Sequence, residues 1–198
     1  MQGKIIGGLT PQQKMVNVNN RFGNKNISGQ QGTTRVLFDS IELSGQTELR
    51  FFENSGSKRY PFTNIGAEGN RLNVGDTFTI QKIYFGVGQV DPDTNELTSW
   101  QPGLGSISGI TVGELNFQIA NSQVIKQLPL TSFGFANLNP TAVNDSDVAF
   151  ETFTDIVIPP LLEYILTVRL ANQVVSANTY VYCFMEGSAA IIAPQTTF

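Results

Sequence analysis

Apolar and polar side chains alternate most regularly near the C-terminus, over residues 148–158. Phe150 and Ile158 fall on one face of this segment, and Glu151 and Asp155 fall on the other. Because successive side chains of a strand point to opposite faces, the pattern predicts a strand with one buried face and one solvated face.

Two more strands are predicted downstream, over residues 164–170 and 180–192. The second of them is apolar on both faces as far as Glu186, which is typical of a central strand in a two-layer β structure. The only cysteine, Cys183, lies in this strand and has no partner for an intrachain disulfide. We therefore expect Cys183 to be a buried, unreactive side chain.

Upstream, the pattern predicts three strands and one hairpin, over residues 35–43, 48–53, 77–87 and 114–130. Within the third strand the apolar face changes at Gln81 and Lys82, which indicates a bulge or a bend. We place the hairpin turn at Asn121-Ser122, because asparagine tolerates the positive φ that a two-residue turn needs. The proline-containing segment 60–64 is suited to a sheet edge or to the entrance of a strand.

Two long segments, 88–113 and 131–147, lack a sustained pattern and are predicted to be loops. A loop of this length in a compact domain is usually functional or interfacial. Trp100, the only tryptophan, lies in the first of them. It is either an exposed anchor for contact with another subunit or a buried lid over one end of the sheets.

About eight strands and no convincing helix make the chain all-β. Turns between short strands favour a two-sheet sandwich, and the jelly roll is the commonest eight-stranded form. We expect a single eight-stranded jelly-roll sandwich over residues 34–198, preceded by an extended, flexible N-terminal arm over residues 1–33, where glycine, glutamine and asparagine are frequent.

Charge is distributed unevenly between the arm and the body. The chain has twelve basic and sixteen acidic side chains, and residues 1–35 contain five of the bases and none of the acids. These five are Lys4, Lys14, Arg21, Lys25 and Arg35. A basic arm on an acidic body favours contact with nucleic acid, with lipid headgroups or with the acidic face of a neighbouring copy. The alternative is a solvated tail.

The chemistry available to an enzyme is narrow, because the chain has no histidine. Nucleophilic systems that use histidine as the base, and histidine metal sites, are therefore excluded. Residues 91–96 resemble the start of a calcium loop, but the sixth position is Glu96 and the twelfth is Pro102, where such loops have glycine and glutamate. We expect an acidic turn there, and no enzyme activity, metal or cofactor.

Several segments, in this order, resemble coat proteins of small tailless icosahedral bacteriophages with jelly-roll capsid proteins. The likeness extends over residues 49–192 and is carried by Leu-Arg-Phe-Phe-Glu-Asn at 49–54, Tyr-Pro-Phe-Thr-Asn at 60–64, Leu-Asn-Val-Gly-Asp at 72–76, Ile-Val-Ile-Pro-Pro at 156–160, Thr-Val-Arg-Leu at 167–170 and Tyr-Cys-Phe-Met-Glu-Gly at 182–187. It is a likeness of pattern and order, with no catalytic signature.

The resemblance implies a structural capsid protein that self-assembles into an icosahedral shell enclosing the genome, in some members over an inner membrane. Its partners would be many copies of itself, other capsid proteins such as a penton or spike, and the genome or the membrane through the arm. It would be located in the virion, and in the host cytoplasm before assembly. The alternative is a phage spike, fibre-head or decoration protein: a trimer with the same sandwich that binds a host-surface glycan.

Overall fold

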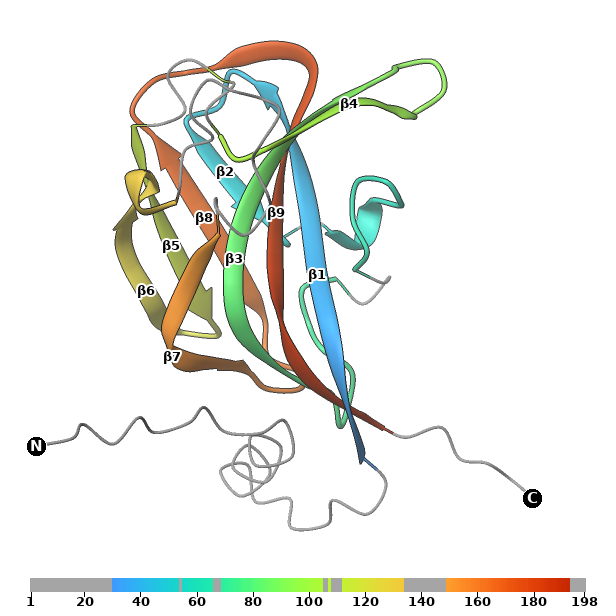
Figure 1. Cartoon of the computed structure of the whole chain (residues 1–198), viewed down its shortest axis with the longest axis vertical. Helices are drawn as coiled ribbons and strands as arrows, with labels where there is room; N and C mark the ends of the chain where they lie inside the picture. Colours follow the sequence, from blue (N-terminus) through green and yellow to red (C-terminus); the bar gives the residue numbers. More distant parts are fainter. Residues whose placement is uncertain are drawn as a thin grey trace, which may run out of the picture.

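The computed structural model describes residues 30–53, 55–65, 69–104, 107, 112–133 and 149–192. In this part of the chain the fold is all-β, with nine strands and two short 3-10 turns, η1 (Ser55–Ser57) and η2 (Leu130–Ser132). The strands form two antiparallel sheets in a sandwich-like arrangement (Figure 1). None of the described helical segments is long and apolar enough to cross a membrane.

The first sheet has β1, β9 and β3 side by side, and both β4 and β7 pair with the far edge of β3. β7 pairs with the first half of β3 and β4 with the second half. The bounds are β1 Gln30–Ser44, β3 Thr77–Val90, β4 Leu97–Pro102, β7 Phe150–Ile158 and β9 Val175–Ile192.

The second sheet has the order β2-β8-β5-β6. The bounds are β2 Glu48–Phe51, β5 Gly113–Ile119, β6 Ser122–Pro129 and β8 Tyr164–Leu170. Burial alternates strictly along β2 and through most of β8, as expected when one face of a sheet packs against the core and the other meets water.

The core lies between the two sheets and is dominated by aromatic and branched aliphatic side chains. Phe51 of β2 and Phe85 of β3 meet across the sandwich with ring centroids 5.9 Å apart, and Phe133 lies edge-on to Phe85 at 5.0 Å. All three are almost completely buried. Burial of a phenylalanine side chain contributes roughly 1.5–3 kcal/mol, so these contacts hold the layers together. Cys183 is fully buried, as predicted.

A β-bulge in β3 confirms the prediction made from the change of face at Gln81 and Lys82. Ile80 pairs with Gly187 and Lys82 with Glu186, so Gln81 is an extra residue opposite β9. A Cβ atom on Gly187 would overlap the carbonyl oxygen of Thr79. Glycine at position 187 therefore lets the two backbones approach closely where the bulge bends the strand.

The prediction of a loop over residues 88–113 was wrong for its first part. β3 continues to Val90, and β4 forms a hairpin with it that projects from the body (Figure 1). This extra strand raises the count from eight to nine. The sequence of this hairpin shows no alternation of apolar and polar residues, because Gly86 and Gly88 have no side chains to bury and most of β4 is exposed.

Smaller corrections concern the ends of elements. The β5–β6 turn consists of Ala120 and Asn121, one residue earlier than predicted, and Ala120 itself takes the positive φ, at 49°. β9 begins at Val175 rather than at residue 180. Of the predicted loop 131–147, residues 134–147 lie outside the described residues, while Phe133 pins the start of the segment in the core.

Candidate functional site

The arm residues singled out from the sequence divide into two groups. Lys4, Lys14, Arg21 and Lys25 lie outside the described residues. Arg35 lies within β1, and its Nη1 atom is 3.4 Å from Oδ2 of Asp76. Because β1 begins at Gln30, the last four residues of the predicted arm also pair with β9. Arg35 thus belongs to the sandwich.

Trp100 lies on β4 and packs against the outer face of the first sheet. Its ring covers Gly86, where a Cβ atom would overlap the indole. It also meets Tyr182 edge-on at 5.3 Å and Phe184 at 5.5 Å, and it remains 37% exposed. The interpretation of Trp100 as a buried lid over one end of the sheets was therefore wrong, and its contact with another subunit stays a prediction.

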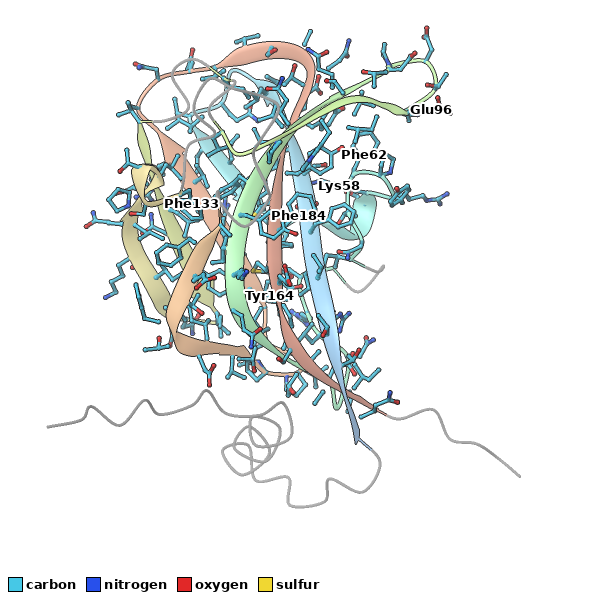
Figure 2. All side chains as sticks on the ribbon, in the orientation of Figure 1. Lys58, Phe62, Glu96, Phe133, Tyr164 and Phe184 are labelled. Carbon is cyan, nitrogen blue, oxygen red and sulfur yellow. The ribbon has the colours of Figure 1, made fainter. Side chains whose placement is uncertain are left out.

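Aromatic rings continue across that outer face beyond Trp100. Phe184 of β9, at the centre of the view in Figure 2, stacks on Tyr84 of β3 at 4.8 Å and contacts Phe38 of β1 at 5.5 Å. Tyr180, on the same strand, meets Phe62 at 4.9 Å. The outer face of a sandwich is usually polar, so this aromatic row is a departure that needs a structural or functional reason.

The turn between β3 and β4 holds the sequence that resembled a calcium loop. Asp91 donates its backbone N–H to the carbonyl of Glu96 at 2.9 Å, and its Oδ1 atom accepts from the N–H of Asp93 at 2.8 Å. These are bonds of a hairpin turn, which confirms the acidic turn. Among the described residues no group of three or more metal-ligating side chains comes together.

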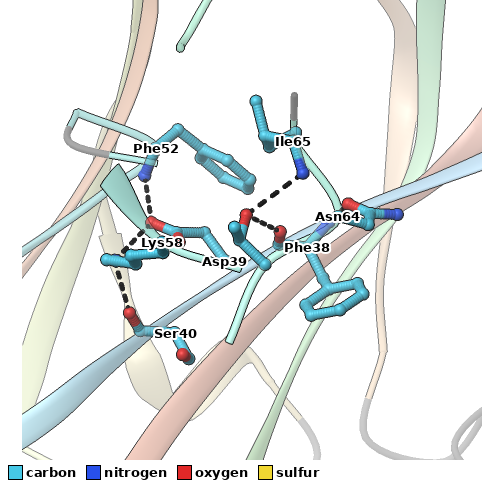
Figure 3. Close-up of polar contacts among 8 residues, drawn as sticks. Phe38, Asp39, Ser40, Phe52, Lys58, Asn64 and Ile65 are labelled. Carbon is cyan, nitrogen blue, oxygen red and sulfur yellow. Dashed lines mark hydrogen bonds and ion pairs between the residues drawn. The ribbon is translucent and has the colours of Figure 1, made fainter. Parts of the chain in front are cut away.

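A buried ion pair fixes the segment that follows β2 against β1 (Figure 3). Asp39 is fully buried, and its Oδ1 atom lies 2.9 Å from Nζ of Lys58. Its Oδ2 atom accepts the backbone N–H of Phe52 at 2.7 Å. Lys58 also donates to the carbonyl of Ser40 at 2.6 Å. Each carboxylate oxygen therefore has partners, as burial of a charge requires.

The same segment then runs beside the free edge of β1, as predicted for the proline-containing stretch. Thr63 forms a bridge with Asp39 and donates its hydroxyl to the carbonyl of Phe38 at 2.9 Å. Asn64 accepts the N–H of Phe38 at 2.8 Å and donates to the carbonyl of Val36 at 2.6 Å. These contacts hold Tyr60 and Phe62 at fixed positions beside β1.

An open pocket of about 860 Å³ lies between this segment, β1, β2 and the β3–β4 turn. Its walls include Glu42 of β1, Arg50 of β2, Tyr60, and Asn95 from the turn. Figure 2 shows Lys58 and Phe62 on the same side of the molecule as Glu96, which is next to Asn95 in the turn. Tyr60 is 83% exposed, so one wall presents an accessible aromatic ring.

Ser40, which lines this pocket, is paired with Tyr182 on the adjacent strand. Both residues are at least 97% buried. Burial is the main cause that raises the pKa of Tyr182 to about 12; the neighbouring Tyr180 adds to the increase, and a side-chain hydrogen bond with Ser40 opposes it. The two buried hydroxyls are therefore placed to satisfy each other.

The chemistry available from Cys183 and from the pocket differs. Burial, and secondarily the charge of Asp39, raises the pKa of the Cys183 thiol well above its usual value, which disfavours the nucleophilic thiolate. The pocket offers aromatic rings and charged groups of both signs. Such a set can orient a small polar ligand.

Sequence reasoning missed this pocket because its walls come from distant parts of the chain. Ser40, Tyr60, Asn95 and Tyr180 approach one another only when β1 and β9 pair and the β3–β4 hairpin folds back. One available signal was the proline-containing aromatic segment at 60–64, which was placed correctly at an edge. No protein-family model matches the chain, and no curated protein matches it significantly.

Proposed function

We propose that this chain is a structural coat protein that assembles with copies of itself into an icosahedral shell enclosing a genome, and that its sandwich is a jelly roll. The observation that carries the proposal is the order of strand pairing. Leaving out the β3–β4 hairpin strand, the sheets have the orders β1-β9-β3-β7 and β2-β8-β5-β6. The first strand lies beside the last in one sheet, and the second beside the next to last in the other. Eight strands in two such sheets are what a jelly roll requires, and jelly rolls occur in many viral capsid domains, so this order supports the proposal.

Open surfaces of the sandwich support contact between copies. In the described part of the chain, β4 and β6 each pair along one edge only, which leaves backbone groups for a neighbour. Phe153 of β7 is 97% exposed, and Val175 at the start of β9 is 74% exposed. Closed symmetry multiplies many weak contacts of this kind, so no single one needs to be strong.

The distribution of charge supports a separate role for the N-terminal residues. Residues 1–29 hold four basic side chains and no acidic one, while the rest of the chain is acidic. Arg35 is engaged with Asp76 in the sandwich, so the four preceding bases carry the expected contact with a neighbour, a genome or a membrane. The absence of histidine agrees with a role in assembly and not in chemistry.

Electron microscopy of the purified full chain tests the proposal. We expect shells or capsomers, and we expect a chain lacking residues 1–29 to keep its β-sheet circular dichroism spectrum while its assembly changes. Replacement of Phe153 by serine should also weaken assembly without unfolding, because that side chain is almost fully exposed. A discrete trimer that is indifferent to the truncation would overturn the proposal in favour of a spike, fibre-head or decoration protein.

A further inference from the structure

We propose that the pocket between β1, the 57–62 segment and the β3–β4 turn binds a neutral sugar unit of a carbohydrate. The proposal goes beyond shell assembly and does not depend on it. It rests on two observations: the size and aromatic wall of the pocket, and its balance of charge.

The pocket has the size and the aromatic surface that a sugar ring requires. Its volume of about 860 Å³ falls within the range of roughly 300–1,000 Å³ typical of small-molecule sites. The rings of Tyr60, Phe62 and Tyr180 line it, and Phe62 and Tyr180 are in contact at 4.9 Å. An aromatic side chain combines apolar area with, in tyrosine, a polar tip, so it can pack on the C–H face of a pyranose and still bond a hydroxyl.

The charges around the pocket nearly cancel, which favours a neutral ligand. Arg50 is paired with Glu53 at 2.8 Å and with Glu48 at 3.7 Å, and Lys58 is paired with the buried Asp39. Among the described residues this leaves Glu42 and Arg59 without an ion-pair partner, one of each sign. An anionic sugar would need surplus positive charge, and none is present in this lining. A carboxylate and a guanidinium together can instead accept from and donate to sugar hydroxyls.

Saturation-transfer NMR with the unassembled full chain tests the proposal directly. The probes are methyl glycosides of glucose, galactose, mannose and N-acetylglucosamine at millimolar concentration, with N-acetylneuraminic acid as the anionic comparison. We expect transfer to at least one neutral glycoside and none to the acid. Binding of the acid alone, or of no probe, would overturn the proposal.

One substitution locates the binding in this pocket. Tyr60→Ala should weaken the affinity about tenfold, because it removes an exposed wall that the fold does not need. If Tyr60→Ala binds the glycosides as well as the unchanged chain does, the sugar is bound elsewhere and the proposal fails.

Phe153→Ala is the matched control. Phe153 is as exposed as an aromatic residue can be, but it lies on β7, separated from β1 by β9 and β3. Its replacement should leave sugar affinity unchanged, while Tyr60→Ala should leave shell formation unchanged. Failure of the sugar proposal is therefore distinguishable from failure of the coat-protein proposal.

Discussion

At the scale of single residues, the sandwich buries several polar side chains. Some of them have hydrogen-bond or ion-pair partners, and others do not. Asp39 belongs to the first kind and is satisfied by Lys58 and by the N–H of Phe52. The hydroxyl of Tyr164 belongs to the second kind, whereas that of Tyr182 lies beside the Ser40 hydroxyl. Burial is the largest cause of the raised pKa of both tyrosines. The proton that each one retains has a consequence for stability at high pH.

We predict that the free energy of unfolding falls as the pH rises from 10 towards 12. Tyrosines of the unfolded chain ionise near pH 10, whereas burial raises the pKa of Tyr182 to about 12 and that of Tyr164 further. Above pH 10 the unfolded state therefore binds fewer protons than the folded state. A rise in pH favours the state with fewer bound protons, which is the unfolded state. Guanidinium unfolding midpoints at pH 8, 10, 11 and 12 measure the decline.

Replacing the buried tyrosines checks the cause of this decline. Tyr164→Phe should flatten the dependence on pH, because phenylalanine has no proton to retain. The exposed Tyr60→Phe serves as control and should leave the slope as it is. An unchanged slope in the Tyr164 variant would show that the loss of stability has another origin.

At the scale of elements, the link between β1 and the segment after β2 depends on one ion pair. We predict that Lys58→Met destabilises the fold by about 2–3 kcal/mol, because it leaves the Asp39 carboxylate buried without its cation. The cost stays below that of a fully buried pair, since the Lys58 side chain is 26% exposed. Denaturant titration measures it, and a second change, Asp39→Asn, should recover part of the loss.

The pair of Arg71 and Glu163 provides the control for this prediction. Both side chains are 52% exposed, so Arg71→Met should cost less than about 1 kcal/mol. Equal costs for the Lys58 and Arg71 variants would contradict the importance of the buried pair and indicate that Phe52 and Thr63 alone hold the segment in place.

Elements were predictable from the sequence wherever one face is buried. β7 and β8 match the predicted strands 148–158 and 164–170 closely, and the bulge at Gln81 followed from the change of face. β4 was not predictable, because its burial pattern is almost uniformly exposed and its side chains Leu97 and Trp100 rest on glycines. The pocket could not be predicted either, because its walls are brought together by the pairing of β1 with β9 and no local sequence motif encodes them.

At the scale of the whole molecule, the first and last strands close the first sheet. Gln30 is opposite Ile192, and the pairing continues along almost the full length of β1 (Figure 1). Contacts this distant in sequence make folding slow, because the chain must close a long loop before they form. They also place the two ends of the described fold side by side, which allows a direct test of the topology.

We predict that a circularly permuted chain folds when residue 192 is joined to residue 30 by a short Gly-Ser linker and the new ends lie between Ala120 and Asn121. That turn is exposed, so its opening removes little burial. Circular dichroism and denaturant titration should show a β-sheet spectrum and one cooperative transition. The control opens the chain at Phe85, in the core, and should not fold. Loss of cooperativity in the first permutant would contradict the paired ends.

The β3–β4 turn lies at the pocket and outside the core. Asn95 reaches the pocket from a six-residue turn, Asp91 to Glu96, that contributes no side chain to the central core. Mutations in this turn are therefore nearly free of the constraints on packing that govern the strands. If the pocket binds the proposed sugar and copies of the chain assemble as proposed, changes at these few positions alter the ligand and leave the surfaces between copies as they are.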